Sequence, residues 1–227
     1  MKEVRVLIAV VLCTTILSCT TDAYDKGEGT YSQMRADLAE AYTTADKSVT
    51  SVVTDDGEQM DFEAPYTAKW LTTADSVYRV LLYYNKVKNA NGRNVAQVVS
   101  MSQVPSAHAH PQSYFNKGVK TDPVKFESVW IGKSQRYMNI GLIVMTGDTG
   151  DNKKTHHLGM VNDTTIVNAD GTRTCYLTLY HDQDGVPEYY SQHLYLCVPV
   201  YDVHADSICL NVNTYNGSIS RTLILRH

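Results

Sequence analysis

From Tyr31 onward, apolar and polar residues alternate in short segments that turn residues separate. A period of two places successive side chains on opposite faces of a strand, whereas a helix repeats about every 3.6 residues. No stretch with the helical period is long enough for a long helix. The 16 tyrosines, with many valines and threonines, also favour strands. The pattern therefore predicts an all-β protein.

The first part of the chain, residues 31–104, has the organisation of a small barrel. Its predicted strands are 34–39, 49–54, 59–62, 77–84 and 95–104. Asp55-Asp56-Gly57 predicts a tight hairpin turn, and a short insert near 67–71 has room for one helical turn. Five strands with such an insert predict an OB-type β domain, and a small sandwich is the alternative.

Residues 105–123 contain three prolines and mark a predicted domain boundary, because proline cannot donate a hydrogen bond inside a central strand. We expect this linker to be cut first by proteases. The remaining segment, 124–227, alternates at short, even spacing. Its predicted strands are 124–130, 137–145, 155–161, 164–167, 172–181, 192–200, 208–214 and 219–225. Seven or eight such strands predict an antiparallel β-sandwich domain.

The N-terminus has the features of an export signal. Lys2 and Arg5 precede an apolar stretch at 6–17, which is too short to span a bilayer. Ser18-Cys19 follows in a context that resembles a bacterial lipobox, where the cysteine is diacylated and becomes the mature N-terminus. We therefore expect 1–18 to be a signal peptide, Cys19 a lipidation site and 19–30 a tether. The alternative is an ordinary signal peptide cut a few residues later.

The sequence carries no recognisable catalytic or metal-binding motif. His108-Ala109-His110 and His156-His157 are the best metal candidates, but exposed histidines in a linker and on a strand explain them better. A net charge of -4 without a long basic run argues against nucleic acid as a partner. We predict no catalytic residue, no bound metal and no cofactor.

Three cysteines remain after the signal peptide and Cys19. Alternation turns Cys175 into the core with its apolar neighbours, whereas Cys197 and Cys209 take the other face of their strands. If residues 201–207 form a hairpin loop, Cys197 lies directly opposite Cys209, within the separation that a disulfide accepts. We predict that Cys197 and Cys209 can bond and that Cys175 is a buried free thiol.

In the order and spacing of its motifs, the chain resembles the NigD-like exported lipoproteins. The motifs are Ile16 to Cys19, Asp55-Asp56-Gly57, Tyr78 to Tyr84, Val129-Trp130, Tyr137 to Ile140, His156 to Leu158, Leu177 to Asp182 and Cys197 to Val200. The resemblance implies an N-terminal OB-type domain and a C-terminal β-sandwich. It also implies an association with bacteriocin immunity, but no activity that could be assigned to particular residues.

We expect a membrane-anchored lipoprotein of the bacterial envelope, on its periplasmic or cell-surface side. Its preferred function is a non-enzymatic binding or accessory module for a protein, peptide or glycan. Two alternatives stay open: an envelope hydrolase using His156, His181 and Asp182, and an immunity protein against a secreted toxin, by resemblance only. Tyr83-Tyr84 and Tyr189-Tyr190 each place one ring on either face of a strand, so one ring of each pair is a candidate surface contact.

Overall fold

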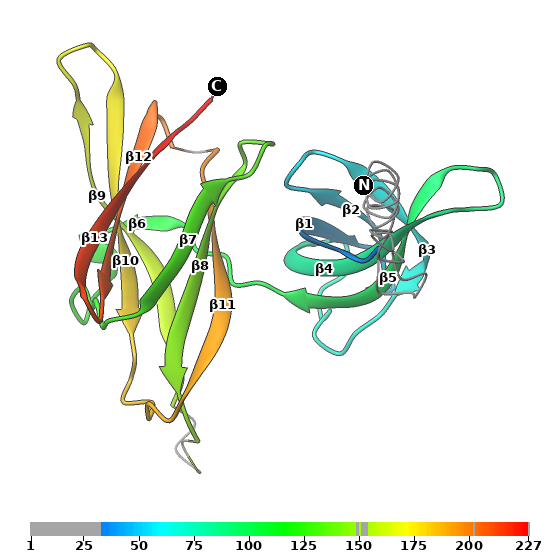
Figure 1. The fold of residues 1–227 in the computed structure, drawn as a ribbon, viewed down its shortest axis with the longest axis horizontal. Coiled ribbons are helices and arrows are strands. Elements are labelled where there is room, and N and C mark those ends of the chain that lie inside the picture. Colours follow the sequence, from blue (N-terminus) through cyan, green and yellow to red (C-terminus); the bar gives the residue numbers. More distant parts are fainter. Residues whose placement is uncertain (1–32, 149, 151–153, 202, 227) are drawn as a thin grey trace, which may run out of the picture. The chain divides into compact units, whose positions relative to one another are not determined.

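The computed structural model describes residues 33–148, 150, 154–201 and 203–226, and within them it is all-β (Figure 1). A closed barrel is followed by two sheets that enclose a second core, as the sequence predicts. The predicted signal peptide, Cys19 and the tether lie outside the described residues. Among the described residues, there is no helix long and apolar enough to span a bilayer.

Five strands make up the barrel, and they close in the order β1-β2-β3-β5-β4. Their bounds are β1 (Arg35–Thr43), β2 (Val49–Thr54), β3 (Gln59–Tyr66), β4 (Val77–Lys88) and β5 (Asn94–Gln103). The turn between β2 and β3 is the predicted one. Gly57 occupies the left-handed region with φ of 84°, and its amide donates to the Thr54 carbonyl. The insert near 67–71 contains a hydrogen-bonded turn from Leu71 to Ala68 and no helix.

The second part of the chain is a sandwich of a five-stranded and a three-stranded sheet. The larger sheet has the order β13-β12-β10-β9-β6 and the smaller one the order β11-β8-β7. Their strands are β6 (Ala109–Pro111), β7 (Lys125–Ile131), β8 (Tyr137–Thr146), β9 (His157–Val167), β10 (Arg173–Asp182), β11 (Tyr190–Pro199), β12 (Ser207–Thr214) and β13 (Gly217–Ile224). A short 3-10 helix, η1 (Gln112–Tyr114), follows β6 directly.

Two features of the sandwich differ from the sequence prediction. The strands expected at 155–161 and 164–167 form one strand, β9, whose register against β10 shifts by one residue at Asp163 and so interrupts the alternation. The sheet is also mixed, because β12 pairs with β10, and β6 with β9, in the parallel direction. Proline fits β6 because an edge strand has one unpaired side.

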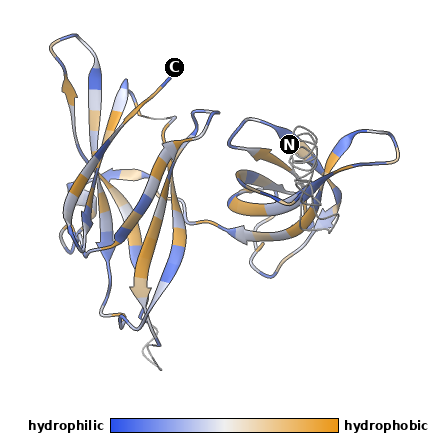
Figure 2. Cartoon of the chain, viewed as in Figure 1, coloured by the Kyte–Doolittle hydropathy of each residue, from blue (hydrophilic) through white to orange (hydrophobic). Residues whose placement is uncertain are grey.

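Apolar side chains gather on the inner faces of both structures, and Figure 2 shows the alternation along the strands. The barrel core includes Val52, Val80 and Leu82, all fully buried. The sandwich core combines residues from both sheets, including Leu142 from β8 and Leu177 from β10. Burying side chains of this size contributes about 1.5–3 kcal/mol each, so the two cores account for why both parts fold.

The strand pairing expected around Cys197 and Cys209 is wrong. Cys197 lies on β11, which pairs with β8 in the smaller sheet, and Cys209 lies on β12 of the larger sheet. These consecutive strands belong to different sheets, so β11 and β12 do not form a hairpin. Both thiols are free, and so is Cys175, which is buried as predicted.

Barrel and sandwich residues share a polar network around Arg79 on β4. Its guanidinium binds the Asp55 carboxylate and the Asn139 side chain, and Asn139 also donates to Asp55 at 2.6 Å. The same guanidinium donates to the Cys197 sulfur at 3.2 Å and lies 4.2 Å from the centre of the Tyr137 ring. Burial, opposed by the nearby arginine, raises the pKa of the Cys197 thiol. Cys197 is therefore a buried, protonated contact and not an exposed thiol.

Candidate functional site

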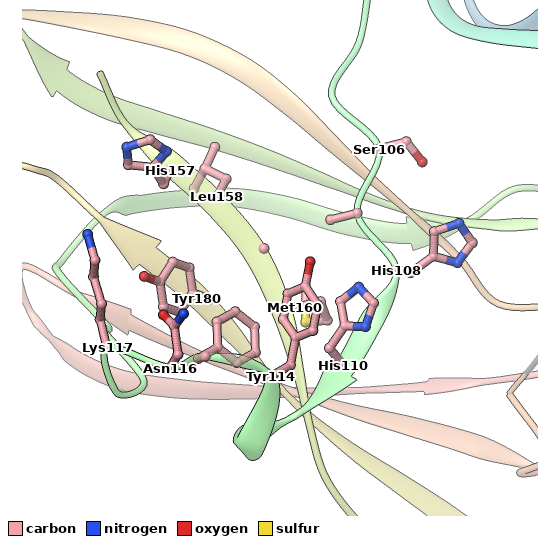
Figure 3. Close-up of a pocket in the computed structure, with 13 residues that line it drawn as sticks. Ser106, His108, His110, Tyr114, Asn116, Lys117, His157, Leu158, Met160 and Tyr180 are labelled. Carbon is pink, nitrogen blue, oxygen red and sulfur yellow. The ribbon is translucent and has the colours of Figure 1, made fainter. Parts of the chain in front are cut away.

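The segment between the barrel and β7 forms one wall of a groove on the sandwich. The groove has a volume of about 780 Å³, and its other wall comes from β9 and β10 (Figure 3). Residues 106–117 contribute the first wall through β6, η1 and the turn that follows. The predicted linker is thus part of the sandwich surface.

Backbone pairing fixes this wall at several points. At its start, the Ala107 amide donates to the Cys197 carbonyl, and at its end the His181 amide donates to the Lys120 carbonyl. Between these points, β6 pairs with β9 from Ala109 opposite Met160 to Pro111 opposite Asn162. These backbone hydrogen bonds hold the wall against both sheets.

Four rings follow one another along the groove. His110 stacks on Tyr114 with centroids 3.9 Å apart, and Phe115 stacks on Tyr180 at 4.5 Å. Tyr114 and Phe115 meet edge to face at 5.4 Å, which joins the two pairs into one row. Tyr114 is 62% exposed, so the row presents an aromatic surface to solvent. Exposed rings of this kind bind apolar or flat partners through dispersion and their π faces.

On the opposite wall, Gly159 on β9 lies next to the Phe115 and Tyr180 rings. A Cβ at this position would lie 3.6 Å from both the Phe115 and Tyr180 rings, which is ordinary contact. The longer side chains of Leu158 and Met160 flank it on β9, and Met160 is buried in the core. Because side chains alternate along β9, Met160 points into the core whereas Gly159 lies on the face that carries the Phe115 and Tyr180 rings.

Several polar side chains at the groove have no hydrogen-bond or ion-pair partner among the described residues. Within the described part of the chain, no hydrogen bond or ion pair involves the side chains of His108, Asn116, Lys117 or His157. Figure 3 shows Lys117 and His157 toward the Tyr180 end of the row and His108 toward its His110 end. Donors left free beside an aromatic surface are typical of a binding site, where a few polar groups orient the ligand.

The groove contains several residues that the sequence analysis considered singly. His108, His110 and His157 all line it, although His157 lies far from the other two in the sequence. In the described parts of the chain, no group of three or more His, Cys, Asp or Glu side chains is placed to hold a metal ion. Sequence reasoning missed Tyr114, Phe115 and Tyr180; the adjacent aromatic residues inside the proline-rich segment were the available signal.

The two tyrosine pairs of the sequence, Tyr83-Tyr84 and Tyr189-Tyr190, lie outside the groove lining. Tyr84 is fully buried and donates to Asp37 at 2.8 Å, and burial followed by this carboxylate raises its pKa. Tyr189 and Tyr190 are both exposed, at 76% and 57%, because the strand β11 begins only at Tyr190. None of these three residues lines the groove.

The residues that the hydrolase hypothesis uses, His156, His181 and Asp182, take part in two separate sets of contacts. His156 Nδ1 lies 2.9 Å from His181 Nε2, and His181 Nδ1 lies 2.9 Å from the Asp122 carbonyl oxygen. The Asp182 carboxylate accepts a hydrogen bond from Lys120 at 2.8 Å, which lowers the pKa of Asp182. In the described structure, no hydrogen bond joins Asp182 to either imidazole, so the His–Asp pair that this hypothesis needs is not formed.

Comparison with solved structures supports the two-part fold. A NigD-like immunity protein from Bacteroides caccae ATCC 43185 has a TM-score of 0.64 at 21% identity, and the match covers 84% of this chain and 96% of that one. A protein of unknown function from Bacteroides vulgatus ATCC 8482 gives 0.57 at 15% identity, covering 85% and 91%. A protein assigned as a lipoprotein from Bacteroides fragilis NCTC 9343 gives 0.58 at 9%, covering 84% and 96%.

At these identities the structural likeness concerns the fold alone, and none of the three descriptions names an enzymatic activity. No curated protein matches the sequence. A family model described as the NigD-like C-terminal beta sandwich domain matches residues 105–225. Its match begins at the first residue of the predicted linker, which is the segment that carries β6 and the groove wall. Because the match covers more than half of the chain, the protein belongs to the NigD-like family.

Proposed function

We propose that this protein is a lipoprotein of the bacterial envelope, anchored through Cys19, that acts as a non-enzymatic binding or accessory module. The export signal in the sequence and the assigned lipoprotein among the similar folds support the location. The observation that carries the function is the groove: exposed rings lie beside polar side chains that form no hydrogen bond or ion pair with the described residues. A binding function needs such free groups, because groups already paired in the free protein would have to exchange partners.

Photocrosslinking in the producing cells tests whether the groove is occupied. Tyr114 is replaced by p-benzoylphenylalanine in the full chain, and Tyr190 is replaced in the same way as the matched exposed control. We expect irradiation to give an adduct from the Tyr114 variant that is absent from the Tyr190 variant. Equal labelling at both positions, or no adduct at Tyr114, would contradict the proposed role of the groove.

Immunity against a secreted toxin is the second candidate. The description of the Bacteroides caccae structure as an immunity protein favours it. Mass spectrometry of the Tyr114 adduct separates the two roles. A secreted toxic polypeptide in the adduct supports immunity, and any other envelope or extracellular ligand supports the accessory role.

A further inference from the structure

The charge of the groove points to the chemistry of its ligand. The protein has 24 Asp and Glu residues against 20 Lys and Arg, yet none of the acidic residues in the described part of the chain lines the groove. The basic side chains of its lining are Lys117 and three histidines, His108, His110 and His157. A site without carboxylates on a protein of net charge -4 complements an anionic ligand.

Two carboxylates on β9 and β10, those of Asp163 and Asp182, are held by other groups. Asp182 lies opposite His157 in the β9–β10 pairing, but it is bound to Lys120. Asp163 accepts hydrogen bonds from Gln112 and Thr178 outside the groove lining. Lys117 therefore keeps its charge available for a ligand.

The edge of the sheet argues against an extended peptide. A peptide commonly binds by adding a strand to a free edge, which needs several unpaired backbone donors and acceptors in a row. Here the edge strand β6 has only three residues, and its last residue, Pro111, has no N–H. The following residues turn into η1, so the edge cannot template another strand.

The row of rings fits a saccharide instead. His110, Tyr114, Phe115 and Tyr180 form two stacked pairs, so the row is longer than one ring and can contact successive sugar units. Pyranose rings present C–H groups to aromatic faces, and their hydroxyls pair with side chains such as Asn116 at the rim. A charged sugar substituent would then reach Lys117 or a histidine.

We propose that the groove binds a carboxylate-bearing saccharide, such as a chain of uronic acids, with the sugar rings on the aromatic row and the carboxylate at Lys117. This inference rests on the proposed binding function and specifies its ligand. The carboxylate supplies a charge-assisted hydrogen bond, and the rings supply the contact area. A neutral glycan lacks the charge, and an extended peptide finds no free strand edge at β6.

The test uses the purified full chain in detergent micelles and isothermal titration calorimetry. The probes are oligosaccharides of galacturonate, alginate and hyaluronan, each with its carboxyl-reduced counterpart, and poly-glutamate as an anion without sugar rings. We expect at least one acidic oligosaccharide to bind about tenfold more tightly than its reduced form, with no binding of poly-glutamate. Binding of none of the three, equal binding of the reduced forms, or equal binding of poly-glutamate would overturn the proposal.

Variants connect the binding to the groove. Tyr114→Ala and Lys117→Gln should each weaken binding about tenfold, because each removes one of the two contacts that the proposal combines. Both side chains are exposed, so the fold should tolerate the changes, which thermal unfolding would verify. Tyr190→Ala is the control and should bind as the wild type does. A polypeptide adduct at Tyr114 in the cellular crosslinking would leave the binding function intact and overturn the saccharide alone.

Discussion

His156 and His181, whose ring nitrogens lie 2.9 Å apart, should make the stability of the sandwich depend on pH. Burial, and then the neighbouring His181, lowers the pKa of His156, while the Met145 backbone and Glu188 act in the opposite direction. A histidine whose pKa is lowered by folding takes up its proton more readily in the unfolded chain. The free energy of unfolding should therefore fall as the pH drops below about 6.5, the ordinary histidine pKa.

His156→Gln isolates this contribution, because the amide can still donate to His181 but does not titrate. We expect chemical denaturation at pH 7 and pH 5 to show a smaller acid-induced loss of stability in the variant than in the wild type. His193→Gln, which removes an exposed histidine from β11, is the control and should keep the wild-type difference. An unchanged pH dependence in His156→Gln would show that folding leaves the pKa of His156 at its ordinary value.

At the scale of elements, strand positions follow from the sequence better than strand partners do. The predicted strand at 49–54 coincides with β2, because alternation and the Asp55-Asp56-Gly57 turn are both local signals. The partner of β11 is not local: it pairs with β8, about fifty residues earlier, and alternation along β11 is the same whichever strand it joins. The groove was missed for the same reason, since Tyr114 and Tyr180 come together only when β6 pairs beside β9.

The turn between β2 and β3 should depend on the glycine at position 57. Gly57 has φ of 84° and open space around its Cα, so an added methyl group meets no atom but forces an unfavourable backbone conformation. Gly57→Ala should lower the free energy of unfolding by about 1–2 kcal/mol. Gly159→Ala, whose Cβ would make only ordinary contacts, should stay within about 0.5 kcal/mol of the wild type. Urea denaturation would measure both, and equal losses would contradict a specific requirement for glycine in the turn.

At the scale of the molecule, the covered face of β11 shows how a sequence pattern can be correct while its interpretation is not. Leu196 and Val198 belong to the sandwich core, so Cys197 does point away from that core as alternation predicts. It is nevertheless fully buried, because Leu38 and Val104 from the barrel side of the chain and Tyr137 pack against it. Facing away from one core therefore does not place this thiol in solvent, where a disulfide partner could reach it.

Attachment to the membrane is the prediction that concerns the protein as a whole. Because Cys19 stands at the end of the apolar stretch, we expect it to carry the acyl chains, and several chains on one residue give stable anchoring where one would not. Cys19→Ala should move the protein from the membrane fraction to the soluble fraction and abolish labelling by an alkyne fatty acid. Cys13→Ala changes the other N-terminal cysteine and should leave both readouts unchanged, since we expect Cys13 to be removed with the signal peptide. If Cys19→Ala still sediments with membranes and still takes up the label, the anchor lies elsewhere.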